Sequence, residues 1–196
     1  MIITEIDDNI KNMLQKTGFS DSFLKSCFFS KFLVAEIIED QIAGVTFVGG
    51  FLNLNGIEVN EKYRGKGIGK KLLNELLDEC KKRNISFLSG VFKPDNKISI
   101  HMHMKIGYIP LFSIFYNENE GREIIVLLPF NKKGKFIRKC FSIFNYRVGN
   151  FIFIILFKLS TPFLKNLIAL DSDMITKIDF KKSIKNFKKV ESLINF

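Results

Sequence analysis

Apolar and polar residues follow regular patterns along the first 130 residues, and these patterns predict helices and strands in alternation. In residues 68–83 the apolar residues recur at helical spacing, at Ile68, Leu72, Leu73, Leu76 and Leu77. Further helices are predicted at residues 7–17, 20–29 and 95–106. Runs of β-formers predict strands at residues 2–6, 32–38, 42–51, 52–60, 85–92, 108–116 and 123–130. The order of these elements predicts a mixed α/β fold, in which helices pack on a mixed sheet.

Beyond residue 130 the pattern changes. Residues 131–135 are predicted to be a linker, and residues 141–159 are strongly apolar. We therefore expect two regions. The first is a domain over residues 1–130, and the second is a basic, Phe-rich, helical C-terminal extension over residues 131–196.

Two helices are predicted within the extension. Thr161 is expected to be the N-cap of a helix over residues 162–170. Residues 180–194 carry an apolar stripe beside several lysines, which predicts a basic amphipathic helix. The longest charge-free run of the extension, residues 148–157, has ten residues, whereas a membrane-spanning helix needs about 20. No conventional transmembrane helix is therefore expected, and an in-plane interfacial helix is left open.

The net charge of +10 belongs entirely to the extension. Residues 1–130 carry equal numbers of basic and acidic side chains, whereas residues 131–196 carry 14 Lys or Arg and 4 Asp or Glu. Three roles stay open for the extension: it completes the core, it binds an anionic membrane surface through residues 141–196, or it binds a partner or nucleic acid. No nucleic-acid-binding motif accompanies its lysines and phenylalanines, so nucleic acid is not expected.

Cysteine usage and the start of the chain give further expectations. Cys27, Cys80 and Cys140 lack metal-ligand spacing, so neither a metal site nor a disulfide framework is expected. The first residues show no basic region followed by an apolar one, so no secretion signal is predicted. We expect a cytoplasmic protein, peripheral at the inner face of the membrane if the extension binds lipid.

A glycine-rich basic segment, residues 64–70, lies between a predicted strand and a predicted helix. Its glycines let backbone N–H groups approach an anion, the helix N-terminus adds a positive dipole end, and Arg64, Lys66 and Lys70 add charge. The combination predicts a pyrophosphate-binding loop; the alternative is an ordinary surface turn before a basic helix. The segment is neither a P-loop nor a dinucleotide fingerprint, because Lys71 and Lys70 stand where those motifs need a hydroxyl and a glycine.

Three segments resemble the GNAT superfamily of N-acyltransferases. The pattern Val59-x4-Arg64-x-x-Gly67-x-Gly69 resembles its acyl-CoA signature. Residues 96–108 are similar to its segment of Asn-x-x-Ala/Ser, Tyr or His, and Lys-x-Gly-Phe/Tyr, and residues 33–44 to its second and third strands. Together they cover roughly residues 30–110 in the right order, which implies a GNAT-like acyltransferase fold. The extension is not covered.

The resemblance implies acetyl-CoA as the acyl donor and no metal. The pantetheine arm would lie between the strands predicted at residues 52–60 and 85–92. Backbone groups near Ile57 and Val59 would bind it and polarise the thioester carbonyl. The loop would bind the pyrophosphate through the backbone N–H groups of Arg64, Gly65, Lys66, Gly67, Ile68, Gly69 and Lys70.

The resemblance also implies roles for the helix predicted at residues 95–106. Asn96 and Ser99 would contact the donor. His103 would stand where many members place a tyrosine that protonates the leaving thiolate. Asn96 can equally be the helix N-cap, and His103 can equally be a histidine that packs on the inner helix face.

The general base departs from the family pattern. Many members carry a glutamate on the fourth strand, and the corresponding residue here is Asn53, whose amide cannot act as a base. Glu58 is the candidate base, turned toward the site by a bulge. The alternatives are that Glu58 is a solvated strand carboxylate and that the base is Glu36, a water chain, or nothing beyond an amine that arrives neutral.

The sequence therefore predicts an acyltransferase that moves an acetyl group from acetyl-CoA to a primary amine by direct attack. The acceptor is a small-molecule or lipid-linked amine, for example an amino sugar. Two alternatives stay open: a long-chain acyl-CoA or acyl-carrier-protein donor, and a non-catalytic acyl-CoA-binding module. The sequence does not give the oligomeric state.

Overall fold

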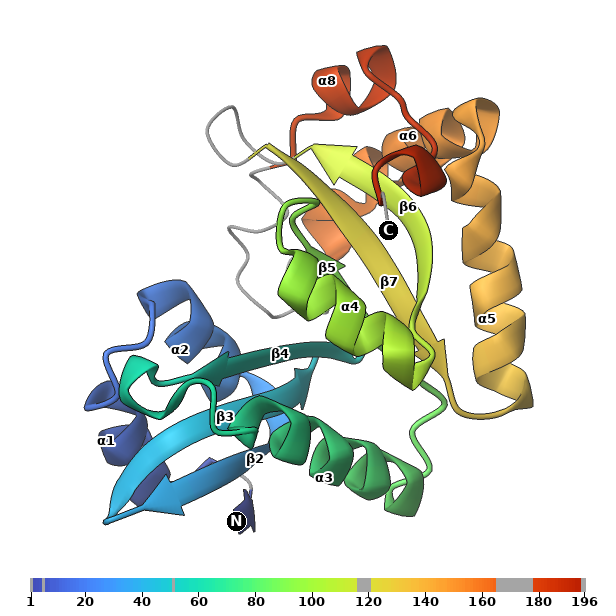
Figure 1. Cartoon of the computed structure of the whole chain (residues 1–196). Coiled ribbons are helices and arrows are strands. Elements are labelled where there is room, and N and C mark those ends of the chain that lie inside the picture. The colour runs from blue at the N-terminus through green and yellow to red at the C-terminus, as the bar shows by residue number, and fades with distance from the viewer. Residues whose placement is uncertain (1, 5, 51, 116–120, 165–177, 195–196) are drawn as a thin grey trace. The chain divides into compact units, whose positions relative to one another are not determined.

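The computed structural model describes residues 2–4, 6–50, 52–115, 121–164 and 178–194 of the 196-residue chain. These residues form two compact units, one within residues 1–85 and the other within residues 86–196 (Figure 1). Each unit combines antiparallel strands with helices that pack on them. The predicted mixed α/β class and the helical C-terminal extension are therefore confirmed.

The first unit contains an antiparallel sheet in chain order: β1 (Ile2–Thr4), β2 (Ser30–Ile38), β3 (Gln41–Gly49) and β4 (Leu54–Val59). A tight turn joins β2 to β3, and its two residues, Glu39 and Asp40, have φ of 50° and 57°. Positive φ at both positions matches the twist of the flanking strands. The strands predicted at residues 32–38 and 42–51 therefore pair as a hairpin.

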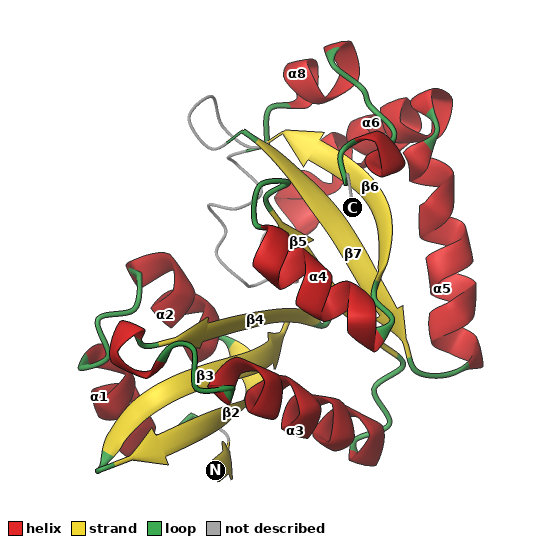
Figure 2. Ribbon diagram, in the orientation of Figure 1, coloured by secondary structure: helices red, strands yellow, loops and turns green. Residues whose placement is uncertain are grey.

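Helices cover both faces of this sheet (Figure 2). α1 (Asp8–Gln15) and α2 (Asp21–Phe28) pack on one face, and their N-caps are Asp7 and Ser20. α3 (Ile68–Lys82) packs on the other face against β2, β3 and β4. Its buried leucines are those at the predicted helical spacing, so this prediction is confirmed as well.

Side-chain alternation along β3 explains the two layers. Val45 and Phe47 belong to the core cluster under α1 and α2. Gly44 faces α3 instead: a Cβ atom there would lie 3.0 Å from Leu72 Cδ1 and 3.1 Å from Ile68 Cγ2. The glycine therefore lets the start of α3 pack directly on β3, which fixes the helix N-terminus beside the end of β4.

The second unit contains antiparallel strands in the spatial order β5 (Phe87–Phe92), β7 (Arg122–Pro129), β6 (Ile109–Phe115). α4 (Lys97–Ile106) covers one face, where the His103 ring lies 4.5 Å from that of Phe92. Gly107, with φ of 102°, ends α4 after Ile106, the last residue of the predicted helix. α5 (Lys132–Ser142) packs on the other face, where its apolar side chains join a buried cluster.

The described residues of the extension fold back on this sheet. α6 (Arg147–Leu164) follows the short η2 (Ile143–Asn145), and the Phe153 ring lies 4.8 Å from that of Phe112 on β6. α8 (Phe180–Lys185) covers the edge of β6, because Phe115 N–H donates to Ser183 Oγ at 2.9 Å. The short η3 (Val190–Ser192) follows, and its Val190 is buried. The extension is therefore part of the core of this unit.

The predicted linker at residues 131–135 is wrong. Asn131 instead caps α5, because its side chain accepts a hydrogen bond from Gly134 N–H at 3.0 Å. A Cβ atom at Gly134 would lie only 2.0 Å from Ser86 O, so the glycine lets the helix start against another part of the backbone. Gly134 is therefore needed for close packing of the helix start, although in the sequence it resembles a loop residue.

Two helix predictions in the extension also need correction. Thr161 is not an N-cap, because α6 continues through Leu164; the rest of the helix predicted at residues 162–170 lies outside the described residues. The helix predicted at residues 180–194 ends at Lys185. Beyond that point Lys188 O accepts from Ser113 Oγ at 3.5 Å, and Val190 N–H donates to Asn145 Oδ1 at 2.9 Å. Tertiary hydrogen bonds replace the helical ones.

Candidate active site

The end of β4 is connected to α3 by η1 (Glu61–Tyr63) and a short loop. Arg64 braces this connection, because its Nε donates to Val59 O at 3.1 Å and its guanidinium pairs with Glu61 Oε1 at 3.2 Å. The Arg64 N–H group donates to Glu61 O at 3.2 Å. Arg64 therefore holds the loop in shape, and its own N–H is engaged within the turn.

Two glycines shape the loop at the N-terminus of α3. Gly65 and Gly67 have φ of 77° and 78°, and a Cβ atom at either would meet no atom within 4 Å. α3 has no side-chain N-cap, so the N–H groups of Ile68, Gly69 and Lys70 in its first turn have no intrahelical acceptor. Open space beside uncapped N–H donors, at the positive end of a helix, is an arrangement that binds anions.

The backbone of β4 offers a second row of polar groups. Asn60 N–H, one residue beyond the strand, donates to Ala43 O at 2.9 Å. Hydrogen-bonded and non-hydrogen-bonded residues alternate along an antiparallel pair, so the N–H and C=O groups of Ile57 and Val59 point away from β3. The hydrogen bond from Arg64 to Val59 O agrees with this direction.

Gly69 connects the loop to these two strand residues. A Cβ atom at Gly69 would lie 3.7 Å from Val59 Cγ2 and 3.9 Å from Ile57 Cδ1, which is ordinary contact distance. The first turn of α3 therefore packs directly beside the side chains of Ile57 and Val59 on β4.

Lysines surround the loop. Lys62 and Lys66 each place Nζ 5.2 Å from the centroid of the Tyr63 ring, which is buried. Lys71 pairs with Glu36 Oε1 at 2.7 Å. Lys62 and Tyr63 could not be predicted from the sequence, because the approach of both lysines to the Tyr63 ring depends on the turn of η1 and leaves no signal in the spacing.

Glu58 points toward α1 and α2, on the face of β4 opposite Ile57. It shares the parity of Gly56, where a Cβ atom would meet the Phe47 ring at 2.6 Å. Burial raises the pKa of the half-buried Glu58 carboxyl group above its usual value, and the Arg64 cation partly offsets this effect. Burial and the nearby Glu58 charge together raise the pKa of the Cys27 thiol to about 12. A carboxyl group with a raised pKa is a candidate proton acceptor.

Two expectations about β4 are corrected. Its pairing with β3 runs without a register shift from Leu54 to Val59, so the bulge expected at Glu58 is absent. Asn53 is not part of the strand: it has φ of 47° and precedes β4 in a turn. Its side chain accepts a hydrogen bond from Lys31 Nζ at 2.7 Å.

The other predicted site residues lie on or just before α4. Asn96 is the N-cap, and its side chain accepts from Ser99 N–H at 3.2 Å. His103 is fully buried, its Nδ1 lies 2.8 Å from Ser99 O, and its ring lies 5.0 Å from that of Tyr108. Because a carbonyl oxygen only accepts, we assign the proton to Nδ1 and the lone pair to Nε2. Nε2 has no hydrogen-bond partner in the described part of the chain.

The buried position of His103 also affects its charge. Burial lowers the pKa of the imidazole below its usual value, and the hydrogen bond to Ser99 O partly offsets this effect. The net effect favours the neutral form of the ring.

The predicted site residues thus fall into two groups. The first unit brings together the strand and loop residues Ile57, Val59, Arg64, Gly65, Lys66, Gly67, Ile68, Gly69 and Lys70, with Glu58 on the opposite face of β4. The second unit places Asn96, Ser99 and His103 along α4.

Comparison with known sequences identifies proteins that are similar to this chain. Residues 14–108 match the sequence model described as the Acetyltransferase (GNAT) family. The L-amino acid N-acyltransferase MnaT of Escherichia coli (strain K12) is 29% identical over 55 residues, which are 28% of this chain. The match spans 32% of that relative, about a third of its length.

Comparison with solved structures identifies acetyltransferases with a similar fold. The ribosomal-protein-S18-alanine N-acetyltransferase from Escherichia coli aligns with a TM-score of 0.52 at 20% identity, over 65% of this chain and 92% of that one. The IAA acetyltransferase from Bacillus cereus ATCC 14579 aligns with a TM-score of 0.53 at 19% identity, over 66% and 99%. At these identities the likeness concerns the fold alone.

Proposed function

We propose, because residues 14–108 match the sequence model of the GNAT acetyltransferase family, that the chain is a member of this family and transfers an acetyl group from acetyl-CoA to a primary amine. The proposed transferase domain covers residues 1–130, and residues 131–196 are its extension. The observation that carries the proposal is the uncapped N-terminus of α3 beside the positive-φ glycines Gly65 and Gly67.

The loop residues fit the pyrophosphate of the donor. The N–H groups of the first turn of α3 are donors without helical acceptors, and a Cβ atom at Gly65 or Gly67 would meet no atom within 4 Å, so the space beside them is open. Lys66 and Lys70 add positive charge. Arg64 keeps the loop in this shape through its bond to Val59 O rather than by contacting the phosphates.

The outward backbone groups of β4 fit the pantetheine arm. Ile57 and Val59 present N–H and C=O groups away from β3, and amide groups of an extended arm can pair with them as a neighbouring strand would. An N–H donor near the thioester carbonyl also stabilises the negative charge that develops on its oxygen.

Glu58 is the proposed general base. Acetyl-CoA supplies an activated thioester. Glu58 accepts a proton from the attacking amine, the new C–N bond forms, and the C–S bond breaks with departure of the thiolate. The raised pKa of the Glu58 carboxyl group makes it a better proton acceptor than an ordinary glutamate once it is ionised.

The role of His103 as general acid stays a prediction. The neutral ring carries its proton on Nδ1, which is bonded to Ser99 O, and offers only a lone pair at Nε2. Protonation of a thiolate from Nε2 requires the imidazolium, which burial disfavours. The same contacts suit a histidine that packs between Phe92 and Tyr108.

The acceptor is proposed to be a small-molecule or lipid-linked amine. The names of the relatives describe acyl transfer to the nitrogen of an amino acid and of an alanine in a protein. Both names support an amine nucleophile here, and neither identifies the acceptor of this chain.

A pair of matched glycine variants tests the proposed donor site. Gly67 and Gly18 both have positive φ, and a Cβ at either would meet no atom within 4 Å. Alanine at either position should therefore cost a similar free energy of unfolding, about 1 kcal/mol. Gly67→Ala alone fills space beside the first turn of α3, so it should raise the KM for acetyl-CoA by about tenfold, or about 1.4 kcal/mol.

The measurement is release of free thiol from acetyl-CoA in the presence of a panel of primary amines. No release with any amine would overturn the proposed activity. An equal change of KM in Gly67→Ala and Gly18→Ala would overturn the proposed position of the donor.

A further inference from the structure

The outer face of α6 is apolar and exposed. It is formed by Val148, Phe151, Ile152, Ile155, Leu156 and Leu159, whose exposed fractions lie between 38% and 71%. These residues recur every three or four positions, so they share one side of the helix. The opposite side is already used for packing, because Ile154 and Asn150 are buried and the Phe153 ring lies 4.5 Å from that of Phe144.

The exposed face is therefore a second apolar face, additional to the one that joins the core. Exposed apolar side chains that occur singly need no explanation, whereas six on one helix face form a contiguous patch of the kind that marks an interaction site.

The charge around this face has one sign. From residue 131 to residue 164 the chain carries seven Lys or Arg and no Asp or Glu. Arg147 and Lys158 border the apolar face of α6 along the helix. On α5, Lys135 and Lys139 are exposed beside Phe136, which is itself 67% exposed.

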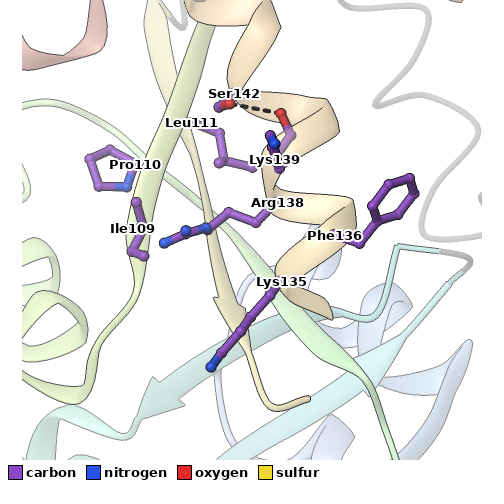
Figure 3. Close-up of a pocket in the computed structure, with 8 residues that line it drawn as sticks. All are labelled: Ile109, Pro110, Leu111, Lys135, Phe136, Arg138, Lys139 and Ser142. Carbon is purple, nitrogen blue, oxygen red and sulfur yellow. Dashed lines mark hydrogen bonds between the residues drawn. The ribbon is translucent and has the colours of Figure 1, made fainter. Parts of the chain in front are cut away.

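A cationic cavity lies between α5 and the start of β6 (Figure 3). Its volume is about 440 Å³, and its lining combines the apolar residues Ile109, Pro110 and Leu111 with cations and a hydroxyl group from α5. Arg138 extends from α5 toward Ile109, whereas Phe136 leaves the helix on another side (Figure 3). No carboxylate belongs to the lining, so the cavity suits a phosphate group with an apolar neighbour.

We propose that α5, η2 and α6 form a surface that binds anionic lipid bilayers, with the α6 face at the headgroup–acyl boundary and the α5 cations on the lipid phosphates. Apolar side chains gain free energy on leaving water, and basic residues beside them are attracted to the negative surface potential of such membranes. This surface lies within one unit, and the inference does not depend on the proposed transferase activity.

The geometry favours a helix pair that lies on the bilayer. No single helix in the described part of the chain is long and apolar enough to span a membrane. The two segments Lys132–Asn145 and Arg147–Ser160 pass that test only as a pair, and they are bent by 106° relative to each other. Gly149 is part of this corner, because a Cβ atom there would lie 2.1 Å from Ile143 O.

The same observations disfavour other occupants. A second copy would bring this face against itself in a symmetric dimer, and the surrounding cations would then repel one another. A nucleic acid would gain from aromatic side chains on which bases stack, whereas five of the six exposed residues on α6 are aliphatic.

Flotation with vesicles tests the proposal on the full chain without acetyl-CoA. The protein should float with vesicles of phosphatidylcholine and phosphatidylglycerol, and its affinity for pure phosphatidylcholine should be lower by about tenfold or more. Binding should weaken as salt is raised. No binding to the anionic vesicles, or equal binding to both kinds, would overturn the proposal.

Two variants with matched controls locate the surface. Ile152→Gln/Leu159→Gln should reduce vesicle affinity by about tenfold or more, because it removes apolar side chains that are exposed and therefore not needed for folding. Its control, Phe29→Gln/Ile98→Gln, replaces two exposed apolar residues elsewhere and should bind as the wild type does. Lys135→Glu/Lys139→Glu should also lose affinity, whereas Lys16→Glu/Lys25→Glu, with the same change of net charge, should retain most of it.

Equal losses of vesicle affinity in the variants and their controls would overturn the proposed location of the membrane-binding surface. A wild-type dimer that Ile152→Gln/Leu159→Gln converts to a monomer, with no vesicle binding by either, would assign the face to a second copy instead.

Discussion

Glu58 combines partial burial, a raised carboxyl pKa and a position facing α1 and α2. As a general base it must be ionised, so kcat/KM should rise with pH through an apparent pKa above the usual range of glutamate. Glu58→Gln should lower kcat by about a hundredfold or more and abolish this limb of the profile. A pH–rate profile with one amine acceptor measures both effects.

Arg64 and Asp78 provide the controls for this prediction. The Arg64 cation lowers the pKa of Glu58, so Arg64→Gln should move the same limb to higher pH. Asp78→Asn removes an exposed carboxyl group that pairs with Lys81 on α3, and it should leave the profile unchanged. A Glu58→Gln enzyme with an intact limb would assign the base elsewhere.

His103 gives a pH dependence of stability. Its pKa in the folded state is lowered below the ordinary 6.5, so the unfolded chain binds the proton more tightly. The free energy of unfolding should therefore fall as pH is lowered from 6.5 toward the pKa of the folded state. His103→Phe should remove this contribution, because phenylalanine fits the contacts with Phe92 and Tyr108 and carries no charge.

Urea unfolding at several pH values measures the His103 effect. His101, which is exposed, is the only other histidine, and His101→Gln should keep the wild-type dependence. A His103→Phe protein with the same pH dependence as the wild type would contradict the neutral buried ring. The same variant reports on catalysis, because a large loss of kcat with intact stability would support the general-acid role.

Predictions about single residues succeeded only where the sequence pattern that marks the residue is local. The loop glycines could be recognised from the sequence, because glycine is the residue that favours positive φ and the apolar spacing of α3 shows where the helix begins. The two lysines beside the Tyr63 ring, and the effect of the Glu58 charge on the pKa of Cys27, depend on residues brought together by tertiary structure, and no local pattern marks them.

At the scale of elements, Gly134 determines how α5 begins. A Cβ atom there would overlap Ser86 O, which already accepts a hydrogen bond from Phe130 N–H at 2.9 Å. Gly134→Ala should therefore lower the free energy of unfolding by about 3 kcal/mol, since a backbone group cannot move aside as a flexible side chain can. Lys133→Ala, at an exposed neighbour on the same helix, should change it by less than about 0.5 kcal/mol.

Urea unfolding of the two α5 variants measures this difference. Equal stability of Gly134→Ala and the wild type would contradict the close approach of α5 to Ser86.

Element predictions succeeded where one periodicity decided the outcome. The leucine spacing of α3 and the runs of β-formers that form β2 and β3 are such cases. They failed in the extension, where Asn131 and Gly134 resemble a loop in sequence but form a capped helix start. They also failed beyond Lys185, because Asn145 and Ser113 take the backbone groups that a continuing helix would use.

At the scale of the whole chain, the family match covers residues 14–108 and therefore includes parts of both units. The mixed α/β class could be predicted because each strand and helix had its own pattern. The packing of the extension on β6 could not, because its basic, Phe-rich composition fits a buried aromatic cluster and a membrane surface equally well. Helix α6 combines both features, because one of its apolar faces packs in the core and another is exposed.

Thermal unfolding of the wild-type protein with acetyl-CoA, palmitoyl-CoA and free CoA tests the central claim most directly. A ligand that binds only the folded state stabilises it by about 2.7 kcal/mol at a concentration of 100 Kd, and each kcal/mol raises Tm by about 2–4 °C for a chain of this size. The donor site at the N-terminus of α3 predicts a rise of several degrees with acetyl-CoA. An unchanged Tm with all three, or a rise with palmitoyl-CoA alone, would contradict it.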